Sequence, residues 1–312
     1  MMCDLARSIF PDKPIANNET HNFPVHCAFD VDGQFIYAAQ LAEMLHGRNA
    51  GVMWTWEIDF HSPWGSYAFT RANCFHAASR AALDSRRLSQ EIAAFRSVPR
   101  QFAIFYSIPS FSDTGHYTRL SNLYQGAFFH GVTPGFVTER QLANADWRPD
   151  VRLVLAPDTR RVEERTFQAL ERLVDAGVTV VRFGEQCLGQ DEYGHDVAAR
   201  KPSLARMVCL PIQEPEQYFP VLRDLFRRHG VAPRHQVTGE NGEPLWALEF
   251  RCSADGALLY AMNWARHPQH IRLPKGVWQE LFDERPSAPE RTMQPLEVRL
   301  FRRCDVVSDA GN

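Results

Sequence analysis

The sequence lacks several features that would place it in a specialised class of proteins. No apolar run in its 312 residues approaches the roughly 20 residues that a membrane-spanning helix needs. A formal net charge of −3 offers no broad basic surface for nucleic acid or anionic lipid. The first residues, MMCDLARSIFPDK, carry acidic side chains and lack the apolar segment of a secretion signal. We therefore expect a soluble protein with no nucleic-acid and no membrane partner.

Cysteine and histidine provide no sign of a disulfide framework or of a metal site. The seven cysteines are scattered, odd in number and free of CxxC spacing. The twelve histidines form no HExxH motif. This usage favours reduced thiols in a cytoplasmic protein, and it implies no metal and no cofactor.

The composition that is present, 45% hydrophobic and 23% charged, is ordinary for a globular chain of two or three domains. Residues 1–97 read as strand, helix, strand, helix. Lys13–Asn18 and the nearly all-apolar Ala50–Trp56 are the strand candidates, and the second is typical of a strand buried on both faces of a parallel sheet. Gln34–Leu45 and Arg71–Phe95 have helical spacing. Two βα units cannot close a barrel, so this region looks like the end of a larger structure.

Residues 98–196 alternate between strands and helices. The strand segments are QFAIFYS, GFVTE, VRLVLAP and VTVVRFGE, and the helices between them include Tyr117–His130 and Val162–Gly177. Strands separated by helices of this length predict a parallel, flavodoxin-like α/β domain with right-handed crossovers.

Residues 197–312 change to short strands separated by turn residues. Leu245–Ser253 and Ala257–Trp264 are joined through Ala254-Asp255-Gly256, which is a hairpin signal. We expect a small antiparallel β-sandwich here.

Polar and aromatic residues follow both strand candidates of the first region. In α/β barrels the residues at the carboxyl ends of strands face the active site. Retaining glycosidases need a carboxylate nucleophile, with a second carboxyl about 5–5.5 Å away, and they also need groups that bind sugar hydroxyls and rings. The alternative is that Asn18 and Glu19 cap a loop while the tryptophans are core residues. The candidates are Asn17, Asn18, Glu19 and His21 after the first strand, and Trp54, Trp56, Glu57 and Asp59 after the second.

The stretch from ARSIFPDKPIANNETH through AGVMWTWE to the helix FTRANCFHAASRAALDSRRLSQEIAAF resembles the last two βα units of clan A glycoside hydrolases, near the β-galactosidases of family 42. The resemblance implies a remnant of a (β/α)8 barrel in which Glu19, after Lys13-Pro14, is the nucleophile. Trp54 or Trp56 would stack on the sugar. The remaining candidates would bind sugar hydroxyls or support the site: Asn17, Asn18, His21 and Glu57.

The resemblance extends to the other two regions. Residues 98–196 resemble the trimerisation domain of those enzymes, and residues 197–312 resemble their C-terminal β-domain. It implies a homo-oligomer such as a trimer, acting on a β-linked galactoside or a related oligosaccharide.

The sequence departs from the family at the general acid/base. That residue belongs at the end of strand 4 of the barrel, far upstream of the nucleophile, yet only eighteen residues precede Glu19. The expectation is a β-galactosidase-like chain that carries the nucleophile end, lacks the acid/base half and is inactive alone. The alternative function is a catalytically inactive fragment that serves as an oligomerisation or carbohydrate-binding module.

One further pair of residues lies where flavodoxin-like domains can carry chemistry. Glu185 and Cys187, in FGEQCLG, follow the last predicted strand of residues 98–196. Nucleophilic attack needs a base within reach, and no convincing Cys–His pairing is found. The sequence therefore favours a structural role for both residues.

Overall fold

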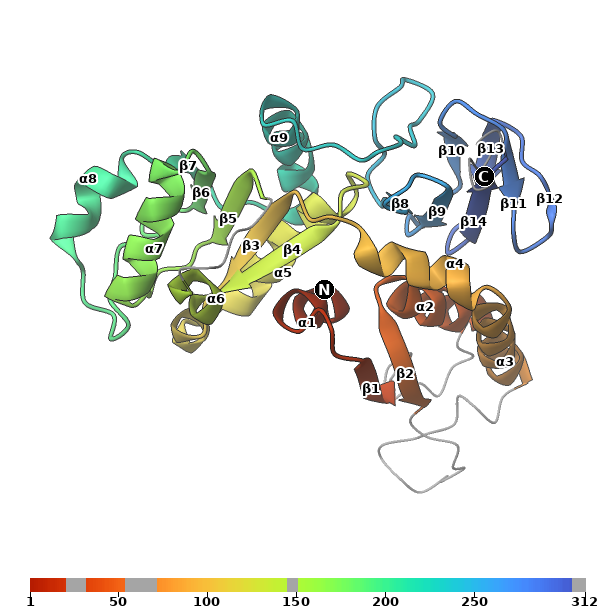
Figure 1. The fold of residues 1–312 in the computed structure, drawn as a ribbon, viewed down its shortest axis with the longest axis horizontal. Coiled ribbons are helices and arrows are strands. Elements are labelled where there is room, and N and C mark those ends of the chain that lie inside the picture. Colours follow the sequence, from red (N-terminus) through yellow and green to blue (C-terminus); the bar gives the residue numbers. More distant parts are fainter. Residues whose placement is uncertain (21–31, 54–71, 145–150, 305–312) are drawn as a thin grey trace, which may run out of the picture. The chain divides into compact units, whose positions relative to one another are not determined.

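The computed structural model describes residues 1–20, 32–53, 72–144 and 151–304, with the backbone alone at 18–20 and 53. The chain divides into two compact units, each built from two separate stretches (Figure 1). The first unit joins Met1–Pro11 to Pro99–Pro233. The second joins Asp12–Val98 to Arg234–Asn312.

The first unit is built on a five-stranded parallel sheet in the order β4-β3-β5-β6-β7. Numbered along the chain this order is 2-1-3-4-5, which is the order of flavodoxin-like sheets. The predicted parallel α/β sheet is thus confirmed. Its strands are β3 (Phe102–Tyr106), β4 (Pro134–Thr138), β5 (Leu153–Pro157), β6 (Thr179–Phe183) and β7 (Val208–Leu210).

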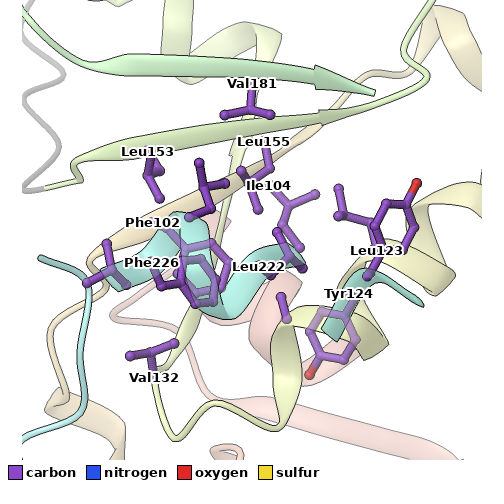
Figure 2. Packing of buried hydrophobic residues seen from close by; sticks show 14 of the residues in the cluster. Phe102, Ile104, Leu123, Tyr124, Val132, Leu153, Leu155, Val181, Leu222 and Phe226 are labelled. Carbon is purple, nitrogen blue, oxygen red and sulfur yellow. The ribbon is translucent and has the colours of Figure 1, made fainter. Parts of the chain in front are cut away.

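Helices cover both faces of this sheet. One core packs Phe102, Ile104 and Leu155 against α5 and α9, as Figure 2 shows. The other core packs Phe105 and Val154 with residues of α6 and α7. Burial on both faces explains why the strands read as continuous apolar runs. The helical segments are α1 (Met2–Ile9), η3 (Pro109–Ser112), α5 (His116–Phe128), α6 (Glu139–Ala143), α7 (Glu164–Asp175), η4 (Ala198–Arg200), α8 (Lys201–Leu204) and α9 (Pro215–Arg228).

This unit differs in extent from the region 98–196 expected from the sequence. Helix α1 belongs to it, because Leu5 enters the core and the Tyr124 hydroxyl donates a hydrogen bond to Asp4 Oδ2 at 2.6 Å. The sheet also continues past residue 196 into β7, and α9 covers one of its faces. The three residues of β7 are too few to produce a sequence pattern.

The second unit begins with a parallel βαβ arrangement. Strands β1 (Ile15–Thr20) and β2 (Arg48–Met53) pair in parallel, with α2 (Gly33–Leu45) between them in the chain. The Asp32 side chain caps α2 by accepting a hydrogen bond from the Gln34 backbone N–H at 2.9 Å. The long helix expected over Arg71–Phe95 is divided into α3 (Ala72–Arg87), α4 (Ser89–Ala94) and the short η2 (Phe95–Ser97).

The rest of the second unit is antiparallel. One sheet has the order β12-β11-β14-β9-β8, and β10 pairs with β13 in a separate two-stranded sheet. The predicted hairpin is present as β8 and β9, with Gly256 in its turn at φ +76°. The strands are β8 (Leu248–Cys252), β9 (Leu258–Asn263), β10 (Gln269–Arg272), β11 (Trp278–Glu280), β12 (Arg285–Pro286), β13 (Glu290–Met293) and β14 (Val298–Arg303).

The larger antiparallel sheet is covered on both faces. Leu259 and Ala261 share a core with Ile271 and Met293 of the small sheet, as expected for a sandwich. Residues on the opposite face of the sheet, such as Tyr260, pack with side chains of α2, α3 and α4. The antiparallel region therefore shares a core with residues that the sequence analysis placed in the region 1–97.

Among the described residues, no helix is both long and apolar enough to cross a membrane.

Candidate active site

The carboxyl ends of β1 and β2 lie side by side. The two strands are parallel, with Asn17 opposite Gly51 and Thr20 opposite Met53. The backbone of Glu19, next to Thr20, therefore lies at the edge of the sheet where β2 ends at Met53. The fold thus places the backbone of Glu19 beside the last described residue of β2.

Most side chains of the predicted site are not described. His21, Trp54, Trp56 and Glu57 lie outside the described residues, and only the backbone of Asn18 and Glu19 is given. Asn17 is half-buried on β1. The roles expected for these seven residues remain predictions.

A cavity of about 420 Å³ lies between the first turns of α2 and α3. Because a helix that follows a parallel strand runs back along the sheet, the amino end of α2 is directed towards the carboxyl edge of β1 and β2. The cavity is lined by polar and aromatic groups, including Asp32, Gln34, Tyr37, Asn73, His76 and Arg80.

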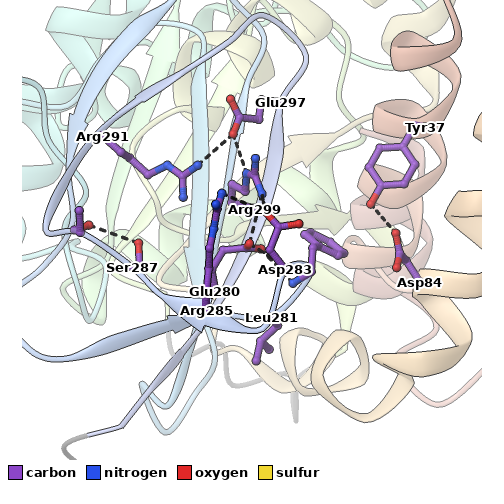
Figure 3. Close-up of polar contacts among 12 residues, drawn as sticks. Tyr37, Asp84, Glu280, Leu281, Asp283, Arg285, Ser287, Arg291, Glu297 and Arg299 are labelled. Atoms are coloured by element: carbon purple, nitrogen blue, oxygen red, sulfur yellow. Dashed lines mark hydrogen bonds and ion pairs between the residues drawn. The ribbon is translucent and has the colours of Figure 1, made fainter.

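Tyr37 is the central aromatic residue of this cavity. Its hydroxyl donates a hydrogen bond to Asp84 Oδ2 at 2.7 Å, as Figure 3 shows, and the Arg80 guanidinium lies 4.6 Å from its ring centroid. Burial, followed by the hydrogen bond to Asp84, raises the pKa of Tyr37 above its ordinary value. The hydroxyl therefore stays protonated, and the ring is fixed between two charged partners.

A second cavity of about 300 Å³ shares Gln34, Tyr37 and Arg80 with the first. Phe282, whose ring centroid is 6.3 Å from that of Tyr37, lines it together with Arg299. Carboxylates hold Arg299 in place: Glu297 at 2.6 Å, Asp283 at 2.8 Å and Glu280 at 3.1 Å (Figure 3). Aromatic rings beside fixed hydrogen-bonding groups are a combination that suits sugar rings and hydroxyls.

Sequence reasoning missed the residues of both cavities. They come from helices α2 and α3, from the turn after β11, from the turn after β13 and from β14, which are far apart in the chain. Each segment alone has the pattern of an ordinary helix, turn or strand. Only their packing brings the polar groups together.

Glu249 of β8 is a buried carboxylate whose hydrogen-bond partners give it a structural role. It accepts hydrogen bonds from Tyr260 at 2.6 Å and Trp264 at 2.8 Å, and it lies 2.7 Å from His46 Nε2. Burial raises the pKa of Glu249, but the charge and hydrogen bond of His46, followed by Arg251 and Tyr260, hold the pKa below its ordinary value. This carboxylate ties the end of α2 to the antiparallel sheet.

Cys187 and Glu185 do not form a reactive pair in the first unit. Cys187 is fully buried, and its thiol donates a hydrogen bond to the Ala156 carbonyl at 3.4 Å. Burial, followed by the charge of Asp158, raises the pKa of Cys187. A protonated, inaccessible thiol is a poor nucleophile, and Glu185 is exposed. No group of three or more metal-ligating side chains is found within the described ranges.

Two comparisons, with protein-family models and with the curated proteins, find no match.

Solved structures, in contrast, match nearly the whole chain. The apo exo-carrageenase of glycoside hydrolase family 42 (GH42) from Bacteroides ovatus has a TM-score of 0.78 and 18% identity, over 96% of this chain and 43% of that enzyme. A catalytic mutant of a GH42 β-galactosidase from G. stearothermophilus has a TM-score of 0.74 and 13% identity, over 97% and 56%. The β-galactosidase from Bacillus circulans sp. alkalophilus has a TM-score of 0.72 and 11% identity, over 97% and 57%.

These matches define the fold of the chain. It is the fold of part of a GH42-like glycoside hydrolase, with a parallel α/β sheet and antiparallel sheets, so the resemblance seen in the sequence is confirmed at the level of fold. The chain spans about half the length of these solved enzymes.

Proposed function

We propose that this chain carries the nucleophile end of a retaining, β-galactosidase-like glycosidase. In this proposal β1 and β2 are the last two strands of a (β/α)8 barrel. The observation that carries the proposal is the parallel β1–α2–β2 unit with Glu19 at its carboxyl edge, in a chain that superposes over 96% of its length on a GH42 enzyme.

The free edge of β2 supports a larger barrel. In the part of the chain that the structure describes, β2 pairs only with β1. Val52 of β2 is 57% exposed, and the neighbouring Ala50 and Gly51 are also exposed. Barrel closure pairs such edges and covers such side chains. The proposed partner strands, and with them the general acid/base, belong to sequence beyond these 312 residues.

The proposed roles follow the resemblance to family 42. Glu19 attacks the anomeric carbon and carries the covalent glycosyl intermediate. Trp54 or Trp56 stacks on the sugar ring, and Asn17, Asn18, His21 and Glu57 bind hydroxyls or support the site. The substrate is a β-linked galactoside or a related oligosaccharide. Without an acid/base the isolated chain is inactive. A cytoplasmic homo-oligomer, such as a trimer, is part of the same proposal.

The test uses the intact protein encoded by the complete reading frame. It should hydrolyse an activated aryl β-galactoside with retention of configuration. Glu19→Ala should lower kcat on the order of 10⁴-fold, since removing the nucleophile abolishes the two-step route. Added azide should partly restore turnover and give the α-glycosyl azide, because a small anion can occupy the vacated space.

The control is Asp12→Ala, which removes an exposed carboxylate three residues before β1. This variant should keep turnover close to wild type. Near wild-type turnover of Glu19→Ala, or formation of the β-glycosyl azide, would show that Glu19 is not the nucleophile.

A second candidate function is a carbohydrate-binding module without hydrolytic activity. The polar cavities around Tyr37 and Phe282 favour it, because they are built from described residues of the second unit alone. The upstream DNA distinguishes the two functions. An in-frame extension that encodes six more βα units favours the enzyme, and a start codon with its own ribosome-binding site at Met1 or Met2 favours the module.

A further inference from the structure

The parallel sheet of the first unit has a point at which the order of its strands reverses. Its first strand, β3, lies between β4 and β5, so the connection after β3 runs to one side, to β4, and the connection after β5 runs to the other side, to β6. In open α/β sheets, ligands bind outside the carboxyl ends of the strands at such a point. Here this position is formed by the loop after β3, the amino end of α5 and the loop after β5.

Two arginines share one buried carboxylate at this point. Asp158, directly after β5, is 1% exposed. Its Oδ2 lies 2.9 Å from Arg119 of α5 and 3.1 Å from Arg160. The two arginine side chains are 25% and 33% exposed, so each keeps contact with solvent. One carboxylate thus fixes two guanidinium groups and leaves a net positive charge with N–H donors at the surface.

Two buried polar groups lie beside this pair. His116, the first residue of α5, is fully buried, and its ring interacts with the backbone of Asp158. The hydroxyl of Thr159 is also fully buried and makes no hydrogen bond to any described residue. Burial lowers the pKa of His116, while the backbone of Asp158 and the charges of Asp158 and Asp113 oppose this shift. Because buried polar groups are nearly always paired, the Thr159 hydroxyl points to a ligand group at this position.

The amino end of α5 adds to the positive field. The helix spans His116–Phe128 and begins at Gly115 without a side-chain cap. Backbone N–H groups at the start of a helix carry partial positive charge and bind anions. Arg119 lies in the first turns of this helix, so the arginine pair and the helix end converge.

The surrounding loops hold this arrangement in place. The hydroxyls of Ser107 and Ser110 donate hydrogen bonds to the Arg161 carbonyl at 3.1 and 3.0 Å, which joins the loop after β3 to the loop after β5. Gly184 approaches so closely that a Cβ there would lie 2.9 Å from Asp158 Oδ1. A site fixed in this way loses little conformational freedom on binding.

We propose that this edge of the sheet binds an oxyanion of the phosphate or sulfate type, held by Arg119, Arg160 and the amino end of α5. The anion is either free or an ester on a sugar. This site lies in the first unit and does not depend on the proposed glycosidase activity.

The experiment titrates the full chain with inorganic phosphate, followed by calorimetry and by backbone amide chemical shifts. We expect saturable binding with a dissociation constant of about 1 mM or lower. The amide shifts should concentrate at residues 116–119 and 159–161. Arg119→Gln and Arg160→Gln should each weaken binding about tenfold or more, since each removes charge-assisted hydrogen bonds.

The matched control is Arg206→Ala, whose guanidinium forms an exposed ion pair with Asp175 in the same unit. It should bind phosphate as wild type does. Each glutamine variant leaves Asp158 with one arginine, so the fold should persist, and circular dichroism checks this. If a glutamine variant does not fold, the lysine variant at that position takes its place, because lysine keeps the positive charge beside Asp158. The lysine variant should also weaken binding, because lysine lacks the planar, forked N–H donors of a guanidinium group.

A second titration distinguishes the source of the anion. Galactose 6-phosphate and galactose 6-sulfate that bind more tightly than the inorganic anions identify a sugar ester, and equal affinities identify the free anion. The absence of saturable binding would overturn the proposal. So would binding that both arginine variants leave unchanged, or amide shifts that occur elsewhere in the chain.

Discussion

At the scale of single residues, His130 shows how burial fixes a protonation state. It is 4% exposed and stacks on Phe219, with ring centroids 4.3 Å apart. Burial lowers the pKa of His130 from its ordinary value of 6.5 to about 3. Between these values the folded chain keeps His130 neutral while the unfolded chain binds a proton. The stability from this residue is therefore present above pH 6.5 and is lost as the pH falls towards 3.

We predict that His130 makes the first unit less stable in mild acid. Between pH 6.5 and pH 5, protonation of the unfolded state should remove about 2 kcal/mol of unfolding free energy. His130→Leu should lack this part of the pH dependence, because leucine does not titrate. Urea denaturation at pH 7, 6 and 5 measures it, and His195→Gln, at an exposed histidine of the same unit, is the control. Equal pH slopes for His130→Leu and wild type would contradict the prediction.

Residues of a site differ in how far sequence can identify them. Glu19 could be proposed from the sequence because it follows a predicted strand, and because the order of strands and helices around it resembles the end of a known barrel. Arg119 and Asp158 could not, because they are 39 positions apart and meet only through the order of strands in the sheet. No local pattern marks such a pair.

At the scale of elements, the strands that the sequence predicts well are those that are buried along their whole length. Strands β3 and β5 have buried residues on both faces, and their apolar runs predict them correctly. Strand β7 has only three residues, and none of them is buried, so uniform burial does not mark it. The single helix expected over Arg71–Phe95 breaks at Leu88, where no glycine or proline gives a signal.

Helix α1, which was not predicted from the sequence and which packs in the first unit, supplies the second prediction. Leu5 is 6% exposed and packs in the core of the first unit. Leu5→Ala should lower the unfolding free energy of this unit by about 3 kcal/mol, through lost burial and a cavity. Met2→Ala, at a residue that is 62% exposed on the same helix, should change it by less than about 0.5 kcal/mol. Denaturant unfolding measures both free energies. Equal effects of the two substitutions would show that α1 does not pack in the core of this unit.

At the scale of the whole molecule, composition and packing divide the chain differently. The sequence changes character near residues 97 and 196, where one kind of secondary structure gives way to another. The cores follow other boundaries: Tyr260 of β9 packs with Phe95, their ring centroids 5.0 Å apart, and Ile36 of α2 belongs to the same cluster. Glu249 joins β8 to His46 within the same unit. Segments that are distant in the chain therefore depend on each other for burial.

This division predicts the behaviour of fragments. Residues 234–312 alone should not fold stably, because Tyr260, Met262 and Leu300 would lose the helices that cover them. We expect this fragment to aggregate or to bind a hydrophobic dye, and coexpression of residues 12–98 should restore protected amides in β9 and β14. The control, residues 99–233, keeps both cores of the first unit apart from α1 and should unfold cooperatively, with reduced stability. A monomeric 234–312 fragment with slow amide exchange in β9 would show that the antiparallel sheets form an independent domain, as the change in composition near residue 196 suggested.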